Sequence, residues 1–367
     1  MVRHTCLCYN NRPAPPTQSD YFKKYIIKEY PAIKIDAFTH IIPPRYREAL
    51  YQRADERFYG GNWDRVIDST PALTDLDNRL RVLDNHEGLS HILTAASPAL
   101  EEAASPKNAV YLSQLINDEM AELTVKYPDK FITAVATLPM NDMEAALIET
   151  DRAIKDLNFK GIQLYTPVDG KPLDSPEFLP LFEKMHQYDL PIWIHPTRGR
   201  GIPDYPGEDH SRYYMYQMFG WPYETTAAMV RLVFSGVFDK YPGIKFITHH
   251  CGAMVPYFSE RVVIGQDYAE TNLKAKWKQA LSRPPIDYLR MFYGDTALNG
   301  NPAALACGYD FFGVEQIIFA TDFPYDNENG ERFTREVIHA VDSLEIPAEH
   351  KEMIFYNNIK RLLKLGQ

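Results

Sequence analysis

The feature that most constrains the fold of this chain is a regular alternation along its length. Short apolar runs rich in β-branched residues alternate with longer segments of helical periodicity, an order typical of parallel strands joined by crossover helices. The eight expected strands cover 33–41, 89–96, 131–138, 160–166, 191–195, 244–250, 290–296 and 316–322. The clearest helices are expected at 108–127, 141–157, 176–188, 224–239 and 331–344. Eight strand–helix units predict an α/β fold, a single (β/α)8 barrel of the TIM type.

An open, doubly wound sheet is the alternative arrangement of such units. Its dinucleotide-binding form needs a glycine fingerprint after the first strand, and His40-Ile-Ile-Pro-Pro stands there instead. A chain of 367 residues is long enough for two or three domains, but barrels with long loop insertions use this length in one domain. We therefore predict an N-terminal extension at 1–32 and one barrel domain at 33–367.

Three connections are too long for simple strand-to-helix loops. They follow the first, fifth and sixth expected strands, at 42–88, 197–223 and 263–289, and they predict insertions on the rim of the barrel. The first of them is rich in aromatic residues. We expect it to cover the barrel mouth as a lid, with Tyr46, Tyr51, Phe58, Tyr59 and Trp63.

Composition excludes several classes of partner. With 39 basic against 49 acidic residues, the net charge of −10 disfavours nucleic acid and anionic membranes. No run of 18 apolar residues occurs and the first 20 residues lack the apolar core of a signal peptide, so a cytoplasmic location is expected. Four cysteines are too few and too unevenly placed for a disulfide framework, and the Cys6/Cys8 pair is a weak metal signal.

Histidine and aspartate residues fall at the carboxyl ends of the expected strands. His40, His195, the pair His249-His250, and Asp322 end the first, fifth, sixth and eighth strands. These ends meet at one rim of such a barrel, where imidazole and carboxylate groups suit a divalent metal such as Zn²⁺. One histidine at a strand end is more often a hydrogen-bonded rim residue, but the four positions together favour a site.

Two further residues have open assignments at this rim. Asp295 ends the seventh expected strand, where it can orient a ligand or cap the following helix. Adjacent residues of a strand point to opposite faces, so only one of His249 and His250 is expected to enter the mouth.

The motifs in these strands resemble the decarboxylase branch of the amidohydrolase superfamily, typified by aminocarboxymuconate-semialdehyde and γ-resorcylate decarboxylases. They are I-D-A-F-T-H-I-I-P (35–43), W-I-H-P (193–196), H-C-G-A-M-V-P-Y (250–257) and A-T-D-F-P (320–324). The resemblance implies one metal, normally Zn²⁺ or Mn²⁺, non-oxidative decarboxylation, and homodimers or larger assemblies. By position it implies His40, His195 and Asp322 as metal ligands, His250 as the catalytic histidine, and Arg261 as an arginine near a subunit interface.

Phe38 departs from the family pattern, which has His or Glu two residues before the ligand at position 40. Phe38 shares a strand face with His40 and cannot bind a metal, so weaker binding, or a site without metal, is expected. Three protein ligands still match the number that catalytic zinc sites use. Alternatively, Phe38 merely fills the core of a non-catalytic relative.

The sequence therefore predicts a metal-dependent lyase that removes CO2 from a small aromatic or unsaturated hydroxycarboxylic acid. In this prediction His250 acts as acid or base and Asp322 delivers a proton. Phe38, Arg198, Asp295 and Arg261 are predicted to contact the substrate, although Arg198, like Arg45 and Arg200, also fits a solvated surface. The alternatives are a metal-dependent hydrolase or hydratase acting on a lactone, ester, amide or double bond, and a silent ligand-binding barrel. The expected partners are the small-molecule acid and further copies of the chain.

Overall fold

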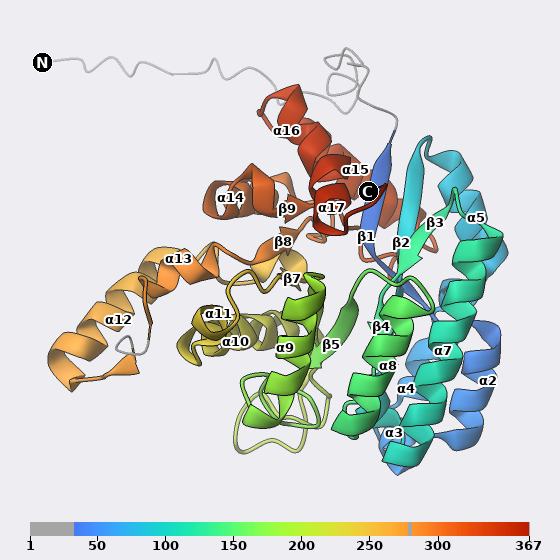
Figure 1. Ribbon diagram of the computed structural model, residues 1–367, viewed down its shortest axis with the longest axis horizontal. Coiled ribbons are helices and arrows are strands. Elements are labelled where there is room, and N and C mark those ends of the chain that lie inside the picture. The colour runs from blue at the N-terminus through green and yellow to red at the C-terminus, as the bar shows by residue number, and fades with distance from the viewer. Residues whose placement is uncertain (1–32, 278–280, 367) are drawn as a thin grey trace, which may run out of the picture. The chain divides into compact units, whose positions relative to one another are not determined.

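A computed structural model describes residues 33–277 and 281–366, and the predicted extension at 1–32, with Cys6 and Cys8, lies outside these described residues. Ile33–Gln367 form one compact unit. Its strands are β1 (Lys34–Ile41), β2 (Leu89–Ala95), β3 (Phe131–Ala134), β4 (Ala136–Thr137), β5 (Ile162–Thr166), β6 (Ile192–Pro196), β7 (Phe246–Thr248), β8 (Tyr293–Asp295) and β9 (Ile317–Ile318). They range from two residues (β4 and β9) to eight residues (β1), and Figure 1 shows how they lie among the helices.

All strand pairs are parallel and follow the order of the sequence. One sheet has the order β1-β2-β3 and the other β4-β5-β6-β7-β8-β9. Only Val135 separates β3 from β4, and its N–H donates to the carbonyl of Leu93 in β2 at 2.9 Å. Main-chain bonds also join β1 to the chain after β9, because Ala37 donates to Phe319 and His40 donates to Phe323. The protein is thus an α/β protein built on parallel sheets.

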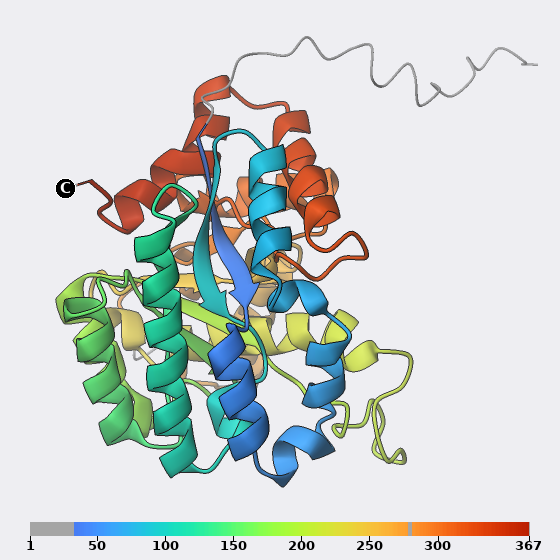
Figure 2. The ribbon, with the colours of Figure 1, turned by 90° about the vertical axis from the view of Figure 1, so that its right-hand side faces the viewer.

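The helices alternate with the strands and cover their outer faces, as Figures 1 and 2 show. In the first half they are α2 (Pro44–Arg53), α3 (Glu56–Gly60), α4 (Trp63–Asp68), α5 (Leu76–Asn85), α6 (Leu100–Ala103), α7 (Pro106–Lys126), α8 (Met143–Lys155) and α9 (Leu179–Tyr188). In the second half they are α10 (Trp221–Phe234), α11 (Val237–Lys240), α12 (Ser259–Leu273), α13 (Pro285–Leu289), α14 (Pro302–Phe312), α15 (Glu331–Ser343), α16 (Ala348–Glu352) and α17 (Asn358–Leu362). None of these helices is long and apolar enough to span a membrane.

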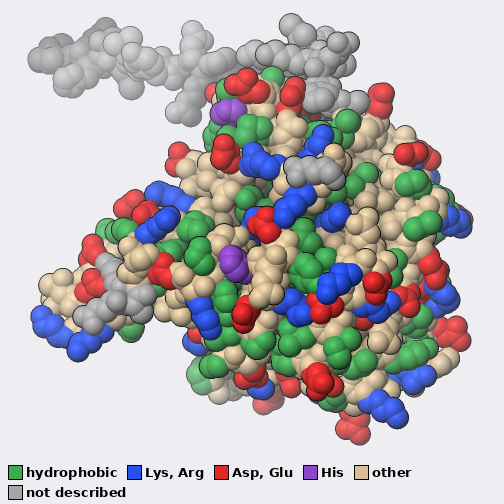
Figure 3. All heavy atoms as spheres, in the orientation of Figure 1, with side chains coloured by type: hydrophobic (Ala, Val, Ile, Leu, Met, Phe, Trp, Pro, Cys, Tyr) green, Lys and Arg blue, Asp and Glu red, His purple; other side chains and the backbone are tan. Residues whose placement is uncertain are grey.

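Two apolar clusters explain the burial pattern. The larger cluster lies between the strands and the helices, and a smaller one contains inward side chains from both sheets. The smaller cluster includes Ile35, Phe38, Ile92, Val135, Trp193, Ile247 and Ile318. Because both faces are covered, β2, β5 and β6 are buried along their whole length, as is typical of parallel sheets. On the face of the molecule that Figure 3 shows, acidic and basic side chains are interspersed.

Two expected strands end earlier than the sequence predicted, and both errors lie near the expected site. β7 ends at Thr248, so His249 and His250 lie beyond it, and β9 ends at Ile318, four residues before Asp322. The backbone then leaves the extended region, with φ values of 55° at His250 and 67° at Asp322. Residues without glycine's freedom hold such values only when the surrounding structure fixes them. The alternation rule for adjacent strand residues therefore does not apply to His249 and His250.

Candidate active site

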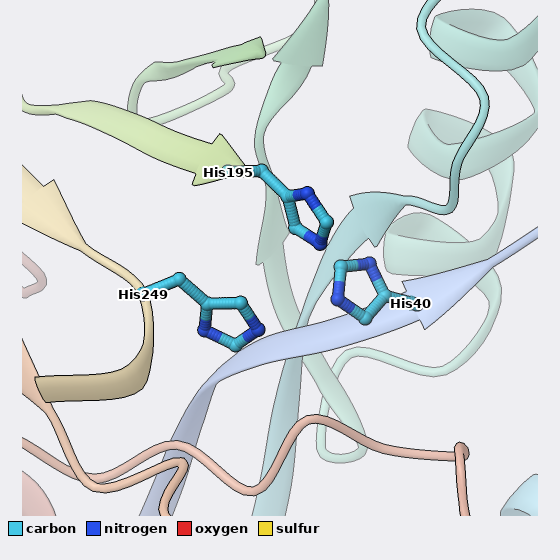
Figure 4. A group of neighbouring side chains, drawn as sticks. All are labelled: His40, His195 and His249. Carbon is cyan, nitrogen blue, oxygen red and sulfur yellow. The ribbon is translucent and has the colours of Figure 1, made fainter. Parts of the chain in front are cut away.

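The strand ends bring three imidazoles together (Figure 4). His40 lies on β1, His195 on β6, and His249 directly after β7, and all three are buried. In the described part of the chain, one group of possible metal ligands comprises these three histidines, and a second comprises His249, His250 and Asp322. Within each group the ligand atoms lie within 4.8 Å of one another. Both His249 and His250 therefore reach the site, which corrects the prediction that only one of them would.

Hydrogen bonds fix the orientation of the rings of His40 and His195. Nδ1 of His40 lies 3.3 Å from the carbonyl of Ala95, and Nδ1 of His195 lies 2.6 Å from the carbonyl of Pro196. A carbonyl oxygen can only accept a hydrogen bond, so in both rings Nδ1 carries the proton and Nε2 presents a lone pair. Nε2 of His40 is buried and makes no hydrogen bond, although Oδ1 of Asp322 lies 3.2 Å away, so its lone pair is left for a metal ion.

Asp322 carries the negative charge of the site. Its Oδ1 lies 3.2 Å from Nε2 of His40 and 3.3 Å from Nε2 of His249. Burial disfavours the carboxylate, but His249 and His40 outweigh burial and hold the pKa of Asp322 well below its usual range. Three imidazoles and one ionised carboxylate form a donor set that fits a divalent metal of the Zn²⁺ or Mn²⁺ type.

The remaining histidines of the site have different electrostatic surroundings. Burial opposes protonation of His249, but the carboxylates of Asp295 and Asp322 outweigh it and raise its pKa to about 10. Burial, together with His249, lowers the pKa of His250 to about 4. Burial and the neighbouring His40 hold the pKa of His195 well below its usual range. His250 is thus neutral at neutral pH, and its buried Nδ1 has no hydrogen-bond partner.

A cavity of about 640 Å³ opens over this group and reaches Asp322. Its wall comes mainly from the connections that follow β1, β2, β6 and β9. Trp221 packs edge-on against His195, and Tyr325 packs against His40, with ring centroids 5.4 Å apart in both cases. These two aromatic residues line the cavity, so a ligand there would lie between apolar rings and the polar group.

The predicted substrate-contacting residues occupy different places. Arg198 lines the cavity and pairs with Glu224 at 2.8 Å, and Arg200 also lines it, whereas Arg45 pairs with Glu119 and Glu122 away from it. Arg261 is exposed on α12 and does not line the cavity of its own chain.

Phe38 and Asp295 differ from the substrate-binding role that the sequence predicted. Phe38 is fully buried beneath the imidazoles and does not line the cavity, so it packs against the site and not against a ligand. Asp295 is also buried away from the cavity. Its carboxylate accepts from the N–H groups of Cys251 and Ala297 and lies 2.6 Å from Nδ1 of His249, a geometry that agrees with the orienting alternative.

Sequence reasoning missed some of the cavity wall. Arg57 lines it from the expected lid segment, between Asp55 at 2.9 Å and Asp169 at 3.3 Å. Glu102, which accepts from the hydroxyl of Thr197, lines it from the connection after β2. Neither residue stands at a strand end, so no spacing signal marked them.

Comparison with known proteins places this geometry in a family. The sequence matches the amidohydrolase family over residues 35–365. It is 30% identical over 305 residues to a γ-resorcylate decarboxylase of Polaromonas sp. strain JS666, covering 79% of this chain and 88% of that protein. It is 27% identical over 350 residues to the 2-amino-3-carboxymuconate-6-semialdehyde decarboxylase of Dictyostelium discoideum, covering 91% and 92% of the two chains.

A solved structure agrees with the sequence matches. The dihydroxybenzoic acid decarboxylase of Polaromonas sp. JS666, with bound manganese and the inhibitor 2-nitroresorcinol, superimposes with a TM-score of 0.73 at 25% identity. The match covers 91% of this chain and 98% of that one. The chain belongs to the amidohydrolase family, in the branch that contains these decarboxylases.

Proposed function

We propose that the protein is a metal-dependent, non-oxidative decarboxylase, a carbon–carbon lyase acting on a small aromatic or unsaturated hydroxycarboxylic acid. The observation that carries the proposal is the buried cluster of imidazole Nε2 atoms and one ionised carboxylate at the floor of an aromatic-walled cavity. The relatives named above, which remove CO2 from such acids, support the same reaction.

In this proposal His40, His195 and Asp322 hold one divalent metal ion. Zinc is our first expectation because imidazole ligands suit it, and manganese is the alternative supported by the related structure. When bound, the ion supplies a Lewis acid for substrate oxygen atoms. β5 offers Gln163 and no carboxylate or lysine, so a second ion would lack a bridging ligand there.

The side chains of the cavity account for the steps of the reaction. Trp221 and Tyr325 exclude water and hold a planar ring. His250 does not itself line the cavity, but its ligand atom lies within 4.8 Å of that of Asp322, which does, so the neutral imidazole of His250 can hydrogen-bond a substrate carboxylate there. The bond from the ring carbon to that carboxylate breaks, CO2 leaves, and the electron pair stays on the carbon. Asp322, which is ionised in the resting site, takes a proton from the hydroxyl group of the substrate and passes it to that carbon to form the new C–H bond, and solvent then returns a proton to the hydroxyl oxygen.

The proposal extends to the architecture around the site. We propose that the parallel strands close into one (β/α)8 barrel spanning 33–367, with insertions at 42–88, 197–223 and 263–289. The bonds from β1 to the chain after β9, and the cluster shared by both sheets, support closure. The 42–88 segment supplies Arg57 and Trp63 to the cavity wall, in support of a lid. The proposal includes a cytoplasmic location and a homodimer.

A substrate screen tests the reaction. Protein purified without chelators or a His-tag is incubated with hydroxybenzoates and unsaturated dicarboxylic acids, and CO2 release is measured beside hydrolysis of lactones, esters and amides. We expect CO2 from at least one acid and about one divalent metal per chain, with both lost in His195→Ala while the circular dichroism spectrum stays unchanged. Hydrolysis without CO2 from any acid would show a hydrolase instead. Inactivity on both panels would favour a silent barrel.

A further inference from the structure

We propose that His249 is a protein ligand of the metal, and that it supplies the donor that Phe38 cannot. The ion would then be held by three imidazoles, from His40, His195 and His249, together with Asp322. The inference rests on the proposed function only in assuming that a metal is bound. It concerns which side chains bind the metal, and not which reaction follows.

The first step is the relation between positions 38 and 249. The ring of Phe38 stacks on the ring of His249, with centroids 4.1 Å apart and planes 27° from parallel. Phe38 also packs against the rings of His40 and His195, with centroids at 5.3 and 5.9 Å. Position 38 therefore lies against the imidazole cluster. A metal-binding side chain at this position would have reached the point between the three imidazoles. The phenyl ring of Phe38 instead packs against one face of the His249 imidazole.

The second step is the orientation of the His249 ring. Asp295 can accept a hydrogen bond at Oδ2 from Nδ1 of His249, at 2.6 Å, while its Oδ1 accepts from two main-chain N–H groups. A carboxylate that holds Nδ1 in this way leaves Nε2 as the metal-binding atom and makes it a stronger donor. Figure 4 shows Nε2 of His249 facing the rings of His40 and His195.

The third step is distance. The ligand atoms of the three histidines lie within 4.8 Å of one another. In a tetrahedral zinc site with Zn–N distances of about 2.1 Å, two nitrogen atoms lie roughly 3.4 Å apart, so any two ring tips need to approach each other by at most about 1.4 Å. All three rings are fixed at Nδ1 by acceptors, so each presents the same atom, Nε2, to the centre.

The adjacent His250 provides a contrast within the same turn. Its Nδ1 has no hydrogen-bond partner, so no acceptor holds that atom as Asp295 holds Nδ1 of His249. Left-handed backbone at His250 and Cys251 turns the chain sharply after His249. The two neighbouring histidines can therefore have different roles: His249 binds the metal, and His250 faces the substrate.

The experiment measures metal affinity without substrate. Metal-free protein is titrated with Co²⁺ in competition with a chromophoric chelator, and the visible absorption of bound Co²⁺ reports its coordination. We expect His249→Ala to weaken Co²⁺ binding by roughly 100-fold or more, and the matched control His250→Ala to stay within about threefold of the wild type. Adding Phe38→His to His249→Ala should restore most of the affinity, because position 38 would again supply a donor.

Two results would overturn the inference: a folded His249→Ala variant that binds Co²⁺ like the wild type, or a double variant no tighter than His249→Ala. If His249→Ala does not fold, pulsed electron paramagnetic resonance of wild-type protein loaded with Mn²⁺ counts the imidazole ligands. Three support the inference and two refute it. Two imidazoles with CO2 release would refute this inference alone, whereas three imidazoles without CO2 release would refute only the proposed reaction.

Discussion

At the scale of single residues, the two histidines after β7 show how one turn can separate two functions. His249 is buried between two carboxylates, which raise its pKa, whereas burial beside His249 lowers the pKa of His250. The imidazole of His249 is thus held by a fixed carboxylate partner, whereas the imidazole of His250 stays neutral near the cavity. This difference agrees with separate roles for the two rings, His249 held by Asp295 and His250 left without a hydrogen-bond partner at Nδ1.

We predict that His250→Ala lowers kcat by at least about 100-fold while the metal content stays near that of the wild type. A positioned acid or base contributes roughly 100-fold to 10,000-fold to such reactions. The measurement is CO2 release with an active substrate, beside metal analysis of the same preparation. His186→Ala, on α9 and distant in sequence, is the matched control and should retain its rate. Wild-type turnover in His250→Ala would assign the acid–base role to another group.

At the scale of elements, the sequence predicted the start of each strand within a few residues, because buried β-branched runs are a local signal. It placed the ends of β7 and β9 wrongly, because contacts between distant parts of the chain determine where these two strands end. The N–H of Cys251 is held by Asp295, and the N–H of Thr321 by Asp36, from distant strands. No glycine marks the left-handed residues His250 and Asp322.

At one helix boundary, by contrast, the sequence itself contains a local signal, a glycine. The helix expected at 224–239 is divided into α10 and α11 at Gly236, whose φ of 76° ends the first helix. The site residues were predictable where they stood on regular strands, as His40 and His195 do. The cavity wall was not, because Arg57 and Glu102 reach it only through the packing of irregular connections.

Helix α5, which belongs to the 42–88 segment, contacts the site. Its buried Arg79 donates to the carbonyl of His40 and stacks over Phe323, with the guanidinium carbon 4.5 Å from the ring centroid. Phe323 follows Asp322, so one guanidinium contacts the main chain of His40 and the residue next to Asp322. Arg79 acts on the site through these neighbours and not through direct contact with the metal.

We predict that Arg79→Met lowers the free energy of unfolding by about 2–4 kcal/mol, because it removes a buried, hydrogen-bonded charge. It should also weaken Co²⁺ binding by roughly tenfold, since both His40 and Asp322 lose support. Thermal unfolding and the chelator competition measure the two effects. Arg81→Met is the control, because Arg81 is exposed on the same helix and its guanidinium donates to the side chain of Asn78, away from His40 and Phe323. Unchanged metal affinity in a destabilised Arg79→Met would leave Arg79 with a purely structural role.

At the scale of the whole molecule, α12 stands out because only two of its fifteen residues, Gln266 and Ala269, are buried. Its inward stripe comprises Val262, Gln266 and Ala269, which pack on the unit or are buried. Its outward stripe carries Arg261, Ile264 and Tyr268, and Ile264 and Tyr268 are 66% and 59% exposed. Further exposed apolar side chains flank the helix at Tyr257, Phe258, Leu273 and Trp277. An apolar stripe of this extent around one arginine is typical of a surface that contacts another chain.

We predict that the protein is a homodimer that associates through this outward stripe of α12. Light scattering during size exclusion should give a mass near twice the 42.3 kDa of one chain. Ile264→Glu with Tyr268→Glu should yield monomers that keep their circular dichroism spectrum, because four carboxylates would otherwise be buried in the symmetric interface. Val125→Glu, at an apolar residue on α7 that is 81% exposed, is the control and should stay dimeric. A wild-type monomer would exclude the dimer, and a dimeric double variant would place the interface elsewhere. Loss of CO2 release on dissociation, with the metal retained, would further indicate that Arg261 serves the partner's cavity.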